Sequence, residues 1–439
     1  MPKVKKSPKS PKSKDKKKPS EKGLIYLDNA ATTFIYPPAA EEFKKWLSCP
    51  NPSTDSKIAN PARCVIQKAR DYIYKLCNIT PLQYTILFTS GASESNCLIL
   101  RSSVEAYKRM RGIIPHIITS ELEHSSILRC VADMEKCGLI QLNLVKPNIY
   151  GVVLPETVEK VIKDNTALIS IMAANNEIGS INNIHAIAKI SHKHSIPFHS
   201  DATQYFPKVN LDVKKFGLDA ISTSAHKHYG PKGIGLLILN NNFIKGYDLK
   251  AQVSGHQQPK ELRGGTLNPA AIASSIVAMK WNFQNRTNKN KYLLSMRNFI
   301  LDELEKHYAI GNYLNYINSG SLVEPHERVE IVILGPPRSN TSFYLPHIIL
   351  LSIAKNKGKK FCNVDFKHLL DKQNVVIGIG SACLTSSYSA SHVLDAISAP
   401  DVIKRGVLRI SLGDYNTMSE IKHFCKIFVE TLNKVLNDK

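Results

Sequence analysis

Strand-forming segments alternate with helix-forming segments through most of this chain, and that alternation constrains its fold more than any other feature. Short runs rich in β-branched and other apolar residues are typical of strands. They lie at 84–88, 116–119, 167–172, 196–199 and 220–223. Apolar residues at helical spacing predict helices over 62–77 and 184–194. Such an alternation predicts a three-layer α/β domain, in which helices sandwich a mostly parallel sheet.

A short polar segment follows each of these five strands. The segments are SGAS (90–93), ELEH (121–124), NNE (175–177), SDATQ (200–204) and SAHK (224–227). Open α/β sheets bind their ligands at the carboxyl ends of the strands. One polar segment would mean little, but five that meet at one edge predict a site built for a single ligand.

The pattern along the chain predicts four parts. We expect a disordered basic tail at 1–22, a segment at 23–34 that joins the smaller domain, a large ligand-binding α/β domain at 35–280, and a small C-terminal α+β domain at 281–439. The small domain has longer helices and few strands, and its last helix is predicted over 421–436. We interpret the lysine-rich stretch at 346–362 as an insertion or an exposed loop.

The formal net charge of +22 is unevenly distributed. Residues 1–22 hold ten lysines against Asp15 and Glu21, so they contribute +8 and leave +14 for the rest of the chain. A segment of Lys, Ser and Pro has no apolar surface to bury and is expected to be disordered. It is interpreted as a solubilising tail, a nuclear-import signal or a weak contact to the phosphate backbone of a nucleic acid.

The cysteines and the apolar runs limit the class of protein. No apolar run approaches the roughly 20 residues that span a bilayer, and no signal-peptide core is present. We therefore expect a cytoplasmic protein, with a nuclear one as the alternative, that is not secreted. The nine cysteines are scattered and form no CxxC pair, which argues against a disulfide framework and against a metal site.

Residues suited to pyridoxal 5′-phosphate (PLP) chemistry occupy the polar segments. A PLP enzyme needs a lysine for the Schiff base, a carboxylate for the pyridine nitrogen, donors for the phosphate and a residue that stacks on the ring. Lys227 lies between two histidines, where desolvation and cationic neighbours favour its uncharged form. Asp201 is the candidate carboxylate, and His124 is the candidate stacking residue. The 90–93 segment lies at a strand-to-helix junction, where a helix N-terminus attracts phosphate.

Each of these residues also has an ordinary structural interpretation. The 90–93 segment and Asp201 are both good helix N-caps. An isolated His124 is more often structural, and a lysine in a glycine-rich turn normally lies on the solvated surface.

Asn176 and Gln204 add hydrogen-bonding groups for the cofactor ring. The set as a whole favours the PLP interpretation.

Nine short motifs resemble, in order, those of the NifS-like cysteine desulfurases. They are YLDNAATT, FTSGASES, EHSSIL, NNEIG, SDATQ, HKHYGPKGIG, RGGT, GSAC and LRISLG. The resemblance covers roughly residues 24–415. It implies a class V aminotransferase of PLP-dependent transferase fold type I, with a mostly parallel seven-stranded sheet and a smaller α+β domain. The activity it implies is sulfur removal from L-cysteine with release of L-alanine.

The resemblance also implies a role for each matched residue. Lys227 would bind PLP as a Schiff base, Asp201 would pair with the pyridine nitrogen, and His124 would stack on the ring and act as acid and base. The remaining contacts would be Ala92, Ser93, Ser224, His226 and the partner subunit's Thr266 for the phosphate, Asn176 and Gln204 for the ring, and Arg409 with Asn51 for the substrate carboxylate. A phosphate contact from a partner subunit implies a homodimer.

Cys383, in GSAC, matches the cysteine that accepts sulfur as a persulfide in this family. Its motif resembles the group with a long catalytic loop, which serves iron–sulfur cluster assembly. The expected acceptors are an iron–sulfur scaffold or a tRNA-thiolation protein. The chain ends soon after LRISLG, where cluster-assembly desulfurases continue, so partner docking is expected to differ.

Two other interpretations remain open from the sequence. A selenocysteine lyase or another class V PLP enzyme would use the same cofactor residues, although an aminotransferase would not need Cys383. A protein of a different class would be an inactive interaction module whose basic tail binds nucleic acid. The presence of Lys227, Asp201, His124 and Cys383 together argues against that module.

Overall fold

A computed structural model describes residues 23–255, 258–319, 329–354, 361–379 and 391–437 of the 439-residue chain. The basic tail at 1–22 and Cys383 lie outside the described residues. The chain divides into two compact units. Unit 1 comprises Met1–Thr32, Asn176–Gly179 and Gln284–Lys439, and unit 2 comprises Thr33–Asn175 and Ser180–Phe283.

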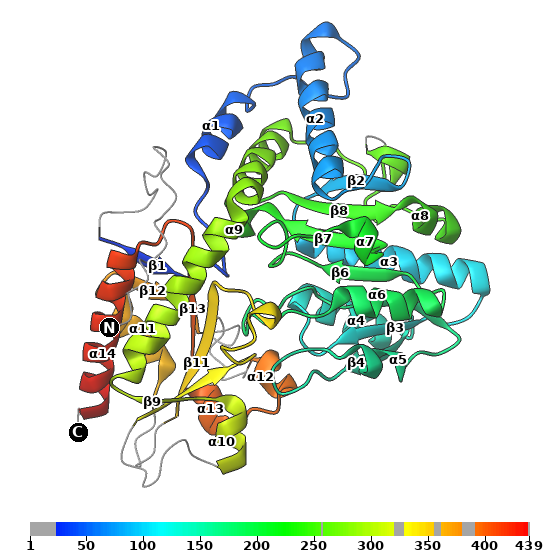
Figure 1. Ribbon diagram of the computed structural model, residues 1–439. Coiled ribbons are helices and arrows are strands. Elements are labelled where there is room, and N and C mark those ends of the chain that lie inside the picture. The colour runs from blue at the N-terminus through cyan, green and yellow to red at the C-terminus, as the bar shows by residue number, and fades with distance from the viewer. Residues whose placement is uncertain (1–22, 256–257, 320–328, 355–360, 380–390, 438–439) are drawn as a thin grey trace. The chain divides into compact units, whose positions relative to one another are not determined.

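Unit 2 contains a seven-stranded sheet of order β2-β8-β7-β6-β5-β3-β4 (Figure 1). Its strands are β2 (Tyr84–Thr89), β3 (His116–Ser120), β4 (Gln141–Val145), β5 (Thr166–Ser170), β6 (Phe198–Asp201), β7 (Ala220–Ser224) and β8 (Gly235–Asn240). Only β8 is antiparallel to its neighbours, which are β2 and β7. Because β8 is antiparallel to both, β2 runs in the same direction as β7, and the five strands that precede the polar segments all end at one edge of the sheet. The predicted mostly parallel sheet is confirmed.

Helices flank this sheet, as predicted. Those of unit 2 are α1 (Pro37–Lys45), α2 (Asn60–Leu76), α3 (Ala92–Arg111), α4 (Ser125–Lys136), α5 (Pro155–Glu159), α6 (Ile184–Lys193), α7 (Val213–Phe216) and α8 (Asn241–Tyr247), with 3-10 turns at Lys57–Ala59, Ala225–Lys227 and Pro259–Glu261. Helices α3, α4 and α8 pack with strand residues around one apolar cluster that includes Ile99, Ile127 and Leu237. The long α3 is held along its length by this cluster, so its N-terminus is fixed relative to the strand ends.

Unit 1 is built from segments that are far apart in the chain. A four-stranded sheet has the order β13-β11-β10-β9, and a second sheet pairs β1 with β12 in parallel. The elements are β1 (Ile25–Leu27), β9 (Ala309–Asn312), β10 (Glu330–Leu334), β11 (Ile348–Ala354), β12 (Val375–Ile377), β13 (Val407–Ser411), α10 (Tyr313–Ser319), α11 (Asn363–Asp371), α12 (His392–Ala396), α13 (Asp401–Arg405), α14 (Met418–Asn437) and a 3-10 turn at Thr341–Phe343. Helix α9 (Pro269–Glu305) contains the boundary between the units.

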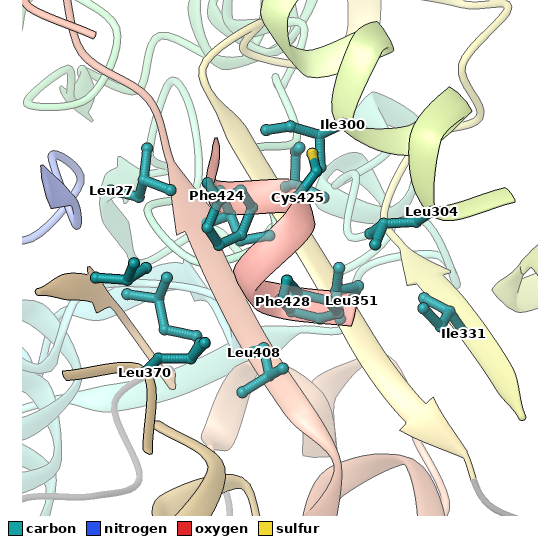
Figure 2. Close-up of a cluster of buried hydrophobic side chains, with 14 of the residues drawn as sticks. Leu27, Ile300, Leu304, Ile331, Leu351, Leu370, Leu408, Phe424, Cys425 and Phe428 are labelled. Atoms are coloured by element: carbon teal, nitrogen blue, oxygen red, sulfur yellow. The ribbon is translucent and has the colours of Figure 1, made fainter. Parts of the chain in front are cut away.

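The core of unit 1 joins its first strand to its last helix. Leu27 of β1, Leu408 of β13 and Phe428 of α14 belong to one buried cluster, which Figure 2 shows with its neighbours. In α14, Phe424 and Phe428 lie one helical turn apart and pack edge-to-face. The N-terminal strand is therefore an integral part of the unit that the C-terminal half of the chain forms.

Two sequence interpretations need correction. The stretch at 346–362 is not an exposed loop over Ile348–Ala354, because those residues form β11, which is buried throughout and pairs with β10 and β13. Its consecutive apolar residues are typical of a strand buried on both faces, and lysines begin only at Lys355, outside the described residues. Strand β6 also starts at Phe198 rather than at residue 196. Within the described ranges, no helix is both long and apolar enough to cross a bilayer.

Candidate active site

Asp201 ends β6 and is a buried carboxylate, with 5% of its surface exposed. Its Oδ2 accepts a hydrogen bond from Asn96 Nδ2 at 2.8 Å, and its Oδ1 accepts one from the Thr203 backbone N–H at 2.9 Å. Both donors are uncharged, and no cation of the described residues forms an ion pair with Asp201. A buried carboxylate in this state is stabilised by a cationic donor such as a protonated pyridine nitrogen.

Lys227 ends the 3-10 turn Ala225–Lys227 that follows β7, and it lies in a group of cationic side chains. Burial is the largest cause that lowers the pKa of His226 to about 4, and the positive charges of Lys227, Lys232 and Lys208 and then His124 contribute to the same shift. The His226 ring is therefore neutral near pH 7 and is surrounded by several cationic side chains. Such a group is complementary to a multiply charged anion, which a phosphate supplies.

The N-terminus of α3 supplies a backbone cradle beside this group. Gly91 precedes the helix, and the backbone of β8 approaches it so closely that a Cβ on Gly235 would lie 2.6 Å from the Gly91 Cα. A Cβ on Gly91 would in turn lie 3.7 Å from Ser224 Oγ. The amides at Ala92 and Ser93 and the Ser224 hydroxyl therefore share one site, which a helix N-terminus makes attractive to phosphate.

His124 is the N-cap of α4, and its tautomer follows from its contacts. Its Nδ1 accepts from the Ser126 backbone N–H at 3.1 Å and lies 2.9 Å from Ser126 Oγ. Because Nδ1 is an acceptor, the neutral ring carries its proton on Nε2. The ring is exposed in the described residues.

Arg409 of β13 is a buried guanidinium in unit 1, with 7% of its surface exposed. Its Nη2 pairs with Asp28 Oδ1 at 2.8 Å, and its Nη1 donates to the Asn176 carbonyl at 3.0 Å. Its Nε has no hydrogen-bond partner among the described residues. Gly378 permits this position, because a Cβ there would lie 3.0 Å from Nε and 2.8 Å from Asp28 Oδ1. A carboxylate ligand would satisfy the remaining donor.

The other predicted residues lie at less informative places. Gln204 is buried beyond the end of β6, in unit 2. Asn176 belongs to unit 1, where its carbonyl holds Arg409. Asn51 and Thr266 are both exposed residues of unit 2, and Asn51 Oδ1 accepts from the Ser53 N–H at 3.0 Å.

Two contacts were absent from the sequence interpretation. Asn96 holds Asp201, and Asp28 holds Arg409. The only sequence signal for them is that Asn96 directly follows the motif FTSGASES and Asp28 lies inside YLDNAATT, which identifies a segment but not a contact.

Comparison with known proteins agrees with this geometry. Residues 25–321 match the family model described as aminotransferase class-V. A cysteine desulfurase IscS of Dictyoglomus turgidum is 33% identical over 413 residues, which cover 94% of this chain and 95% of the relative. The chain belongs to the NifS/IscS-like cysteine desulfurases.

Solved structures of this family resemble the described chain. One named NifS-like protein has a TM-score of 0.78 at 28% identity, with 93% of this chain and 99% of the other covered. Another, described as SspA in complex with cysteine, has a TM-score of 0.71 at 29% identity, with 90% and 100% covered. The predictions of family and of fold type I are thus confirmed.

Cysteine desulfurases of the class V aminotransferase family depend on PLP, and the residues of unit 2 fit this cofactor. The cationic group at Lys227, Lys232 and Lys208 and the cradle at Gly91 suit its phosphate. Buried Asp201, held by neutral donors, suits its ring nitrogen.

Glu123, next to His124 in this desulfurase, is a buried carboxyl group whose protonation state can be tested by experiment. Burial raises the pKa of Glu123 to about 8 from 4.5, while its Oε1 accepts from the Met172 N–H and from Ser120 Oγ. Between these pH values the unfolded chain is ionised and the folded chain is protonated, so the free energy of unfolding should fall as pH rises through this window. Glu123→Gln should remove that fall.

Urea unfolding at several pH values measures the effect as the difference between wild type and variant. Buried histidines, whose lowered pKa values act in both proteins, cancel in this difference. Glu121→Gln, two residues away and only partly buried, is the control and should keep the wild-type profile. Parallel profiles for Glu123→Gln and wild type would contradict a protonated Glu123.

Proposed function

We propose that this chain removes sulfur from L-cysteine with PLP bound in unit 2, releases L-alanine and carries the sulfur as a persulfide on Cys383. The observation that carries the proposal is the position of Lys227, beside a cradle and cation group suited to phosphate and on the same sheet edge as Asp201. The persulfide would pass to an acceptor, an iron–sulfur scaffold or a tRNA-thiolation protein. Iron–sulfur assembly is favoured by the GSAC motif.

The residues of unit 2 would bind and orient the cofactor. Lys227 would bind it covalently, and Asp201, fixed by Asn96 and Thr203, would keep a proton on its ring nitrogen. The phosphate would accept from Ala92, Ser93, Ser224 and His226, while Gln204 and Asn176 would contact the ring and His124 would stack on it. When bound, PLP supplies an electron sink that stabilises negative charge on the substrate carbon.

The same chain would then move protons and sulfur. Arg409, with Asn51, would bind the substrate carboxylate, and the amine of Lys227 would take the proton from the substrate Cα. His124, with its proton on Nε2, would act as acid and base beside it. The Cys383 thiolate would attack the substrate sulfur. The C–S bond breaks, its electron pair stays with the substrate carbon, and protonation at that carbon completes alanine.

The first prediction concerns Lys227. Lys227→Ala should abolish the visible absorbance of the bound cofactor, because the covalent link is lost. Borohydride reduction of the wild type followed by peptide mapping should place the pyridoxyl group on Lys227. Lys232→Ala, in the same cationic group, is the matched control and should keep the absorbance. A pyridoxyl group on Lys232 would reverse the assignment.

A second prediction separates cofactor binding from sulfur transfer. Cys383→Ser should keep the cofactor absorbance, since Lys227 and Asp201 are unchanged, but should form no protein persulfide. Alanine production from cysteine should fall by orders of magnitude, as expected when a covalent nucleophile is removed. Cys64→Ser and Cys137→Ser, both at exposed positions, are controls that should keep wild-type turnover. Wild-type alanine production by Cys383→Ser would refute the proposed role of that cysteine.

A third prediction tests the homodimer. Thr266 is exposed within its own chain, and we propose that the partner subunit's Thr266 contacts the phosphate. Lys227→Ala and Thr266→Ala protomers, unfolded together and reassembled, should recover activity, because one site of the heterodimer then has both residues intact. Mixtures no more active than the two parents would show that Thr266 does not act across subunits.

A further inference from the structure

Helices α3 and α4 bring two thiols and a guanidinium together outside the set of residues proposed for catalysis. Cys97 of α3 is half-buried, and Cys130 of α4 is 4% exposed. Cys130 belongs to the apolar cluster against which Cys97 packs, so the two thiols lie in one cluster, and Arg101, one turn after Cys97, acts on the pKa of both. The Cys97 thiol also lies 3.6 Å from the carbonyl oxygen of Ser126, one turn before Cys130.

This arrangement divides the pair into a thiolate and a thiol. The hydrogen bond from Cys130 lowers the pKa of Cys97 to about 7; burial opposes this shift and Arg101 supports it. The same hydrogen bond and burial raise the pKa of Cys130. Elsewhere burial raises the pKa of Cys425 to about 12 and also raises the pKa of Cys77. An accessible thiolate beside a second thiol is the arrangement that oxidants attack.

We propose that Cys97 and Cys130 are a redox-active dithiol, which hydrogen peroxide converts to a disulfide that bridges α3 and α4 and weakens cofactor binding. The Cys97 thiolate attacks one peroxide oxygen, the O–O bond breaks, and hydroxide leaves to become water. The Cys130 sulfur then attacks the Cys97 sulfur of this sulfenic acid, the S–S bond forms as the S–O bond breaks, and the departing hydroxide takes the Cys130 proton to give a second water. One peroxide is reduced to two waters for each pair of thiols oxidised.

The link to the cofactor site is made by Asn96, which precedes Cys97 in α3. Its Nδ2 lies 3.1 Å from Ser126 Oγ and 2.8 Å from Asp201 Oδ2. The disulfide would tie the two helices together beside the Ser126 carbonyl, which the Cys97 sulfur faces. The Asn96 carboxamide contacts both Ser126 of α4 and Asp201. A disulfide between α3 and α4 would therefore change the position of this carboxamide and its hold on Asp201. This link rests on the proposed role of Asp201, whereas disulfide formation does not.

The first experiment tests the disulfide in full-length Cys383→Ser protein, which removes the competing nucleophile. Peroxide treatment, digestion without reductant and mass spectrometry should give one cross-linked pair of peptides containing Cys97 and Cys130. The pair should have two hydrogens fewer than the separate peptides and should disappear with dithiothreitol. Adding Cys97→Ser or Cys130→Ser should abolish it, while adding Cys137→Ser, a matched exposed cysteine at the end of α4, should not. Absence of the cross-link, or its persistence without Cys130, would overturn the proposal.

The second experiment measures PLP affinity of the reduced and oxidised protein by titration of the bound-cofactor absorbance. Oxidation should raise the Kd by about 5-fold or more, the lower end of common coupling between sites, and Cys130→Ser should remove this response. A cross-link that leaves the Kd unchanged would overturn the link to cofactor binding. Failure of both forms to bind PLP would instead count against the proposed function and leave the disulfide result standing.

Discussion

The position of Lys227 depends on two close backbone approaches that only glycine permits. A Cβ on Gly230 would lie 2.7 Å from the Ala225 Cβ, and one on Gly235 would lie 2.8 Å from the Thr223 carbonyl oxygen. The first approach closes the turn that contains Lys227, and the second returns the chain as β8 between β7 and β2. The first residue of β8, Gly235, lies against both Gly91, which precedes α3, and Thr223 of β7. This close contact places the N-terminus of α3 beside the end of β7. A side chain at either glycine would separate the lysine from the phosphate cradle.

The two glycines matter for function because the turn that they permit carries cationic side chains of unit 2. The turn contributes Lys227 and Lys232 near His226, and the segment after β6 contributes Lys208; burial, together with these charges, lowers the pKa of His226. Like charges at close range oppose folding unless a counter-ion is present. A bound phosphate is therefore expected to stabilise the folded unit as well as to orient the ligand. Asp201 lies on the same edge with neutral partners, so the site has a positive end suited to a phosphate and a negative end suited to a cationic group.

Sequence patterns predicted those elements of the fold and site that depend only on neighbouring residues in the chain. The strands before the polar segments could be placed because β-branched runs and their order need no knowledge of distant residues. Strand β8 (GLLILN) was not predicted, since its glycine-rich start was interpreted as part of the turn. Strand β11 was mistaken for a loop because nearby lysines outweighed seven consecutive buried residues. The contact of Asn96 with Asp201 spans 105 residues, and Cys97 is paired with Cys130 only by helix packing, so neither could be found from local pattern.

The proposed substrate-binding residue Arg409 shows the same limit of prediction from sequence. Its motif identified a guanidinium suited to a carboxylate, but the structure shows that two of its nitrogens are already committed to Asp28 and to the Asn176 carbonyl. Those partners come from the start and the middle of the chain, so three distant segments must fold together before the guanidinium is held in this position. Lysine could not reproduce this arrangement, because a single ammonium lacks the planar set of donors that serves the protein and a ligand at once. The specificity of the clamp therefore depends on the tertiary structure of unit 1 and not on the charge of Arg409 alone.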